Sequence, residues 1–338
     1  MKKFSFKGIF LILITIALMW YILKDNFDGI VGVLLTSNVW WILVAIIIYI
    51  IFLSLESLMT KFLINQYDKD YSLFKAIKLT IMAKFFNGVT PFSSGGQPLQ
   101  VYELKEEGLR TSSGIAVVTE HFIINQTCIV LLSLLASGVN YIFKFIIIDT
   151  TLKHLFILGL ILNVGLLIIV YILSAYKNVY KKIIFPIIKF LSKLKIIKNS
   201  KKIEENVKEA CQNYYVCYAK MIKNKKLVLK TILIQTLALL VTFSIPVFVF
   251  FSLGYLEHMN LVACLIISVY VFIVGSYIPL PGGSGGIEYA FITCFSLYVV
   301  DSYVVSALIL WRFITYYLPM IIGAMVFNIR KSKHKHAL

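Results

Sequence analysis

Residues 276–288 read Ser-Tyr-Ile-Pro-Leu-Pro-Gly-Gly-Ser-Gly-Gly-Ile-Glu, and residues 87–98 read Asn-Gly-Val-Thr-Pro-Phe-Ser-Ser-Gly-Gly-Gln-Pro. When Pro91 is set on Pro281, both stretches contain Pro-x-x-Ser-Gly-Gly, 190 residues apart. Proline and glycine interrupt helices, and non-helical backbone at membrane depth is tolerated only inside protein or beside a water-filled cavity. The repeated motif therefore predicts two copies of one unit, each containing a broken helix.

The composition around these stretches is that of an integral membrane protein. Of the 338 residues, 59% are hydrophobic and 14% are charged, whereas a soluble domain has about 45–50% apolar and about 25% charged residues. A soluble globular enzyme, a disordered chain and a coiled coil are excluded. The five cysteines are scattered without metal-ligand spacing, and no nucleotide-binding motif is present, so we expect no metal and no cofactor.

Six apolar runs have about the length that a bilayer requires. They cover residues 8–23, 39–58, 114–143, 155–176, 228–253 and 303–327. The first run contains Trp20 and Tyr21 near its end, which are typical of a membrane interface, and no cleavage site follows it. We therefore expect an uncleaved membrane anchor there.

Lysine and arginine orient the predicted spans. Residues 177–226 contain 14 lysines and three glutamates, a net charge of +11, and both chain ends are basic. The connections that would lie on the other side sum to −2; they are residues 24–38, 144–154, 254–259 and 301–302. The positive-inside rule then places both termini and the long basic segment in the cytoplasm.

The two motif-bearing stretches fit between these spans only as hairpins. Residues 73–108 must leave and re-enter the cytoplasmic face, and residues 260–300 must do the same on the opposite face. The predicted fold is an all-α polytopic membrane protein with about six full spans and two oppositely oriented re-entrant hairpins, an inverted repeat. We divide it into a first half (1–176), a basic cytoplasmic segment (177–226) and a second half (227–338).

The basic segment has two interpretations. Residues 179–197 place apolar residues at helical spacing with lysines around them, which suits a helix lying on the anionic lipid of the inner leaflet. The alternative is a helix packed on the cytoplasmic face of the bundle. Tyr214, Tyr215 and Tyr218 lie among lysines, but no nucleic-acid-binding fold accompanies them, so we expect no nucleic-acid partner.

Four charged residues lie within or beside apolar runs: Lys84, Glu120, Glu288 and Arg312. An unpaired charge at the bilayer centre costs about 2.5 kcal/mol or more, so these side chains should face a cavity or each other. Arg312 is the first candidate to hold an anionic headgroup, because guanidinium binds phosphate in a bidentate fork. The alternative is a purely structural pair of Arg312 with Glu288 or Glu120.

Further polar residues extend the candidate site. Glu120 with His121 and Asn125 suits a proton relay or a satisfied polar patch, whereas Glu56, near a predicted cytoplasmic helix end, is expected to snorkel. Helices that begin at the two glycine pairs would point positive dipole ends into a cavity, unless the glycines serve only close helix packing. The remaining substrate-binding candidates are Ser94, Gly95, Gly96, Ser284, Gly285, Gly286 and Tyr316.

The sequence resembles the flippase-like membrane region of lysylphosphatidylglycerol synthases and its stand-alone relatives. The resemblance covers nearly the whole chain and depends on Asn87…Pro91…Gly95-Gly96, Glu120, Pro279-x-Pro281-Gly-Gly-x-Gly-Gly-x-Glu288 and Arg312-x-x-x-Tyr316-x-x-Pro319…Gly323. The first-half pattern departs from the family where an arginine commonly follows the glutamate, because His121 occupies that position.

The resemblance implies a protein of a bacterial plasma membrane that translocates a phospholipid such as aminoacyl-phosphatidylglycerol, or a lipid-linked glycan. In the two-part proteins, a separate soluble domain transfers lysine from lysyl-tRNA, and we expect this sequence, which ends at Leu338, to lack that domain. A translocase is therefore expected rather than an enzyme. The alternative is a membrane component of phosphatidylglycerol lysyltransferase, acting in resistance to cationic antimicrobial peptides. A homo-oligomer is compatible with either function.

Overall fold

The computed structural model describes residues 32, 35–147, 149–176, 185–186, 188, 192, 200–255 and 260–335. Within these residues every regular element is helical, as the all-α fold class predicts. The predicted first span (8–23) and nearly all of the amphipathic stretch 179–197 lie outside the described residues.

Five segments of the described chain are long and apolar enough to cross a membrane. They match the predicted runs from residue 39 onward. The segments are α3 (Val39–Ile64), α6 (Thr111–Phe143), α7 (Thr150–Ala175), Lys225–Ser252 and Tyr303–Arg330. Lys225–Ser252 comprises α10 (Lys225–Phe243) and α11 (Ile245–Ser252), and these two helices meet at Ser244, just before Pro246.

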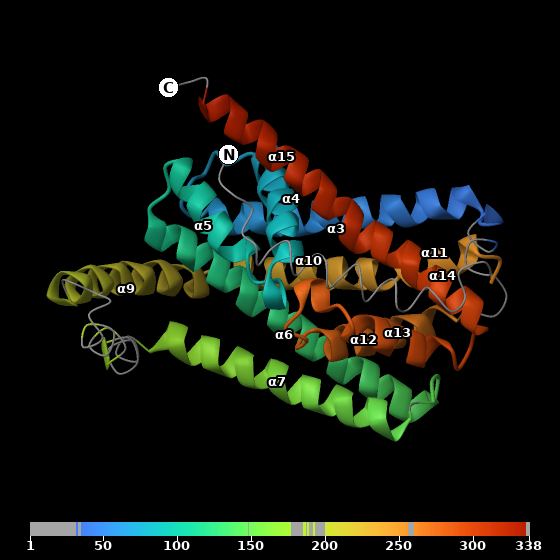
Figure 1. Ribbon diagram of the computed structural model, residues 1–338. Helices are drawn as coiled ribbons and strands as arrows, with labels where there is room; N and C mark the ends of the chain where they lie inside the picture. Colours follow the sequence, from blue (N-terminus) through green and yellow to red (C-terminus); the bar gives the residue numbers. More distant parts are fainter. Residues whose placement is uncertain are drawn as a thin grey trace.

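The two motif-bearing stretches form helical hairpins. The first consists of α4 (Leu73–Val89), the 3₁₀ turn η2 (Pro91–Ser93) and α5 (Gly96–Glu106). The second consists of α12 (Leu261–Gly275), the 3₁₀ turn η3 (Pro281–Gly283) and α13 (Gly286–Phe295). In Figure 1 the first hairpin lies toward the left of the bundle and the second toward the right, and their tips η2 and η3 contact each other.

Helix packing between the two halves is reciprocal. The last span consists of α14 (Asp301–Arg312), a π-helical segment (Phe313–Tyr317) and α15 (Leu318–Lys335). Helix α15 packs on α4 of the first hairpin, while α6 packs on α12 of the second, and α3 pairs with α10. Within the halves, α3 contacts α6 as α11 contacts α14, and α5 contacts α6 as α13 contacts α14. This pattern is the one expected of two oppositely oriented copies of one unit.

Helix α9 (Ser200–Lys223) covers one end of the bundle. Its Tyr214 donates a hydrogen bond to Ser174 Oγ at 2.8 Å, and Tyr215 donates to the carbonyl oxygen of Tyr176 at 2.8 Å. Tyr215 and Tyr218 are buried. The part of the basic segment that the structure describes therefore packs on the bundle by the tyrosine face of α9, whereas both interpretations given for residues 179–197 concern a stretch that lies almost entirely outside the described residues.

Candidate functional site

The two residues after the motif proline have the same left-handed backbone conformation in both hairpin tips. Phe92 and Ser93 have φ values of 54° and 51°, and Gly282 and Gly283 have φ values of 63° and 65°. The next two positions differ, because Ser94 and Gly95 have helical dihedral angles whereas Ser284 (ψ 142°) and Gly285 (φ 88°) do not. In each tip the serine of the motif closes the turn. Ser94 donates from Oγ to the carbonyl oxygen of Pro91 at 3.0 Å, and Ser284 donates to that of Pro281 at 2.8 Å. The repeated sequence thus encodes a repeated turn.

The two tips differ in exposure. Residues 91–94 of the first tip are exposed, and the Phe92 side chain is 58% accessible. In the second tip, Pro281, Gly283 and Ser284 are buried. Non-helical backbone is therefore enclosed by protein at the second tip and accessible at the first.

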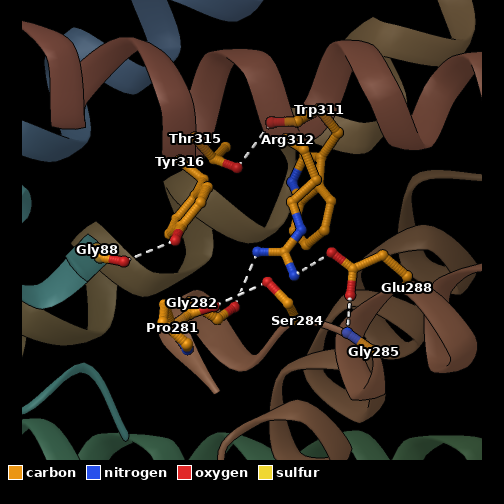
Figure 2. Close-up of polar contacts among 10 residues, drawn as sticks. All are labelled: Gly88, Pro281, Gly282, Ser284, Gly285, Glu288, Trp311, Arg312, Thr315 and Tyr316. Atoms are coloured by element: carbon orange, nitrogen blue, oxygen red, sulfur yellow. Dashed lines mark hydrogen bonds and ion pairs between the residues drawn. The ribbon is translucent and has the colours of Figure 1, made fainter. Parts of the chain in front are cut away.

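An ion pair holds the second tip in place (Figure 2). Arg312 Nη1 donates to the carbonyl oxygen of Gly282 at 2.9 Å, and Arg312 Nη2 lies 2.6 Å from Glu288 Oε1. The other carboxylate oxygen of Glu288 accepts from the backbone N–H of Gly285 at 2.6 Å. Arg312 and Glu288 are each 3% exposed. Of the two partners expected for a structural Arg312 pair, the structure has Glu288.

Tyr316 joins this ion pair to the first hairpin. Its hydroxyl donates to the carbonyl oxygen of Gly88 at 2.7 Å, and its ring lies 5.3 Å from the Arg312 guanidinium carbon. A Cβ atom at Gly282 would collide with the same ring. Tyr316 lies in the π-helical segment, a feature that often occurs at functional sites. The sequence did not predict this π segment, because its residues continue an ordinary apolar run.

Neutral side chains cap the first tip. Asn87 Oδ1 accepts from the N–H of Gly96 at 2.7 Å, and Thr90 Oγ1 accepts from the N–H of Gly95 at 2.8 Å. These two donors at the start of α5 are therefore already satisfied, and an incoming anion would have to displace the caps. Sequence reasoning missed this role for Asn87 and Thr90, although both are residue types that cap helices.

Lys84 forms a second ion pair, away from Arg312. Its Nζ atom lies 2.6 Å from Glu56 Oε2, and the Lys84 and Glu56 side chains are 21% and 16% exposed. Lys84 also lies 4.9 Å from the centroid of the Phe52 ring. The expectation that Glu56 snorkels at a helix end was wrong, because α3 continues for two further turns to Ile64 and brings Glu56 opposite Lys84.

Glu120 lies in a third position, near α9. It is 3% exposed, and its Oε2 atom has no hydrogen-bond partner within the described part of the chain. Burial raises the pKa of the Tyr67, Tyr214 and Tyr218 phenols, and the negative charge of Glu120 contributes to each increase. These three tyrosines are therefore its neighbours, whereas Arg312 is paired with Glu288.

A hollow of about 230 Å³ opens between the start of α5, the turns of α6 around Glu120, and α7. It is lined by Gln97, Val118, Thr119, Phe122 and Val170. Gln97 follows the Ser94-Gly95-Gly96 motif directly. The hollow thus lies next to Gln97, just after the first tip, and next to the turns of α6 on either side of Glu120.

Residues 8–323 match the family described as the lysylphosphatidylglycerol synthase transmembrane region. The chain belongs to this family. It is also similar to a UPF0104 membrane protein of Archaeoglobus fulgidus, with 25% identity over 334 residues that cover 96% of this chain and 97% of the relative. Both similarities extend across the two hairpins, so the family resemblance expected from the sequence is confirmed.

Proposed function

We propose that this protein is a lipid translocase that moves the headgroup of a phospholipid or a lipid-linked glycan across the plasma membrane. The observation that carries the proposal is the exposed, non-helical tip of the first hairpin beside the 230 Å³ hollow. Broken backbone at membrane depth requires protein or water around it. A polar headgroup would pass along the exposed tip and the hollow, while the acyl chains of the same lipid stay in the membrane.

The parts of the site have different roles in this proposal. Ser94, Gly95, Gly96 and Gln97 would contact the headgroup, because they lie at or next to the exposed tip and the hollow. Arg312 and Glu288, with Ser284, Gly285 and Gly286, would hold the second tip against the first, and Tyr316 would link the two tips. Arg312 would then be a positioning residue whose guanidinium reaches the headgroup only if it leaves Glu288.

A leaflet-resolved lipid assay in proteoliposomes tests the headgroup path. Gln97→Leu removes the amide at the hollow at nearly constant volume, and Gln212→Leu makes the same change at an exposed position of α9. We expect translocation of a fluorescent or aminoacylated phospholipid to fall several-fold in Gln97→Leu and to stay unchanged in Gln212→Leu. Equal rates in both variants would remove the hollow from the path.

The family's description names a synthase, and this favours a second candidate, a membrane component of phosphatidylglycerol lysyltransferase. Purified protein supplied with lysyl-tRNA and phosphatidylglycerol separates the two functions. We expect no lysyl-lipid, because a translocase moves lipids without transferring lysine to them. Turnover by the purified chain would favour the synthase instead.

A further inference from the structure

The strongest unassigned feature is a buried polar stretch on α6. Glu120 is 3% exposed with Oε2 unpartnered, and the adjacent His121 has a buried Nε2 that is also unpartnered within the described residues. Further along the helix, Asn125 accepts from Gln235 at 2.7 Å and Gln126 donates to Asn163 at 3.0 Å. On α6 itself, the buried side-chain atoms without a partner belong to Glu120 and His121, within the described residues.

No cation in the described structure is placed to neutralise Glu120. The titratable groups near it are the phenols of Tyr67, which follows α3, and of Tyr214 and Tyr218 on α9. Lys84 of α4 is already paired with Glu56 of α3, and it is His121 that interacts electrostatically with this pair. An isolated buried carboxylate is so unfavourable that the group binds a proton instead.

We propose that Glu120 is a proton-binding site that couples proton movement to lipid translocation. In the conformation described here, the carboxyl is closed off by α9 and carries a proton. When α9 and α5 separate from α6, water in the adjoining hollow would reach the carboxyl and accept the proton. His121 and the Glu56–Lys84 pair would form the next polar groups toward the hairpins. The proton-binding part of this proposal stands independently of the proposed translocase function, whereas the coupling part depends on it.

Infrared difference spectroscopy of the purified protein tests proton binding directly. A protonated buried carboxyl gives a C=O stretching band that an amide lacks. We expect this band in the wild type and in Glu209→Gln, which changes an exposed glutamate of α9, and its loss in Glu120→Gln. Glu120→Asp should move the band rather than abolish it. A band that persists in Glu120→Gln, or no such band in the wild type, would overturn the proposal.

Proteoliposomes with imposed gradients test the coupling. We expect a pH gradient to change the wild-type translocation rate by several-fold, and this response to disappear in Glu120→Gln while Glu209→Gln keeps it. A sodium gradient at constant pH should have no effect. A rate that ignores the pH gradient or follows sodium would overturn the coupling. If no lipid moves under any condition, the translocase proposal fails, while the infrared result still decides whether Glu120 binds a proton.

Discussion

The two hairpin tips share the left-handed conformation of the two residues after the motif proline but are stabilised by different chemistry. The second tip has glycines at its three positive-φ positions, Gly282, Gly283 and Gly285, and a buried ion pair from Arg312 and Glu288. The first tip places Phe92 and Ser93 in the same conformation and is capped by the neutral Asn87 and Thr90. A repeated motif has thus become one enclosed, rigidly held turn and one exposed turn. In the proposed function, the second tip would give support and the first would contact the ligand.

Removing one member of the buried ion pair should have the largest effect. Arg312→Gln leaves Glu288 buried without a cation, and we expect a loss of about 3–5 kcal/mol of unfolding free energy. Thermal unfolding in detergent measures this loss, with size-exclusion chromatography to report the fraction of protein that stays folded. The double variant Arg312→Gln/Glu288→Gln should recover much of the loss. Lys84→Gln breaks the less buried pair of the first half, whose side chains are 21% and 16% exposed, and should cost less than Arg312→Gln. Equal losses of unfolding free energy in Arg312→Gln and Lys84→Gln would contradict the difference between the two ion pairs.

The positive-φ positions should respond in opposite ways to substitution. Gly282→Ala adds a Cβ in the left-handed region and against the Tyr316 ring, so we expect a loss of about 1–3 kcal/mol. Phe92→Gly removes the backbone strain of the left-handed conformation at that position, but it also gives the unfolded chain more conformational entropy. The unfolding free energy should therefore change by less than about 1 kcal/mol. The same unfolding measurement compares the two variants. A larger loss in Phe92→Gly than in Gly282→Ala would show that the first tip is the rigid one.

Loss of the caps on the first tip should have a moderate effect on stability. Asn87→Ala and Thr90→Val each leave one N–H at the start of α5 without its partner, and each should cost about 1 kcal/mol. If the freed N–H groups become accessible to a lipid phosphate, the concentration of anionic lipid that half-saturates translocation should fall. Vesicles of graded phosphatidylglycerol content test this, and an unchanged half-saturation would show that the caps do not compete with the headgroup.

The two serines should show the smallest effect on stability and the clearest separation of roles. Ser284 is buried, so Ser284→Ala should cost about 1 kcal/mol, whereas Ser94 is exposed and Ser94→Ala should stay within about 0.5 kcal/mol. We expect translocation per folded molecule to fall more in Ser94→Ala than in Ser284→Ala. The reverse order would place the headgroup at the second tip.

Much of the fold could be predicted from the sequence because membrane solvation restricts it strongly. Apolar runs of bilayer length became spans, and the two Pro-x-x-Ser-Gly-Gly motifs became turns at which α5 and α13 begin, at Gly96 and Gly286. The partners of the buried charges were harder to predict. Glu288 was one of two open choices for Arg312, and Glu56 was wrongly expected to snorkel, because the partner of a charge depends on helix rotation and length. The caps from Asn87 and Thr90 depend on a local turn geometry that no periodicity reveals.

The bond from Tyr316 to Gly88 spans 228 residues of chain, and this distance has a consequence for synthesis. Helix α4 completes its packing against α15, so the first hairpin emerges from the ribosome long before its main partner exists. During that interval its polar caps must be shielded by the insertion machinery or by a provisional contact with α3, which also packs on α4. Chains that terminate before residue 316 should therefore be inserted but remain open to membrane-embedded proteases. The assembly of this protein is completed by its last span.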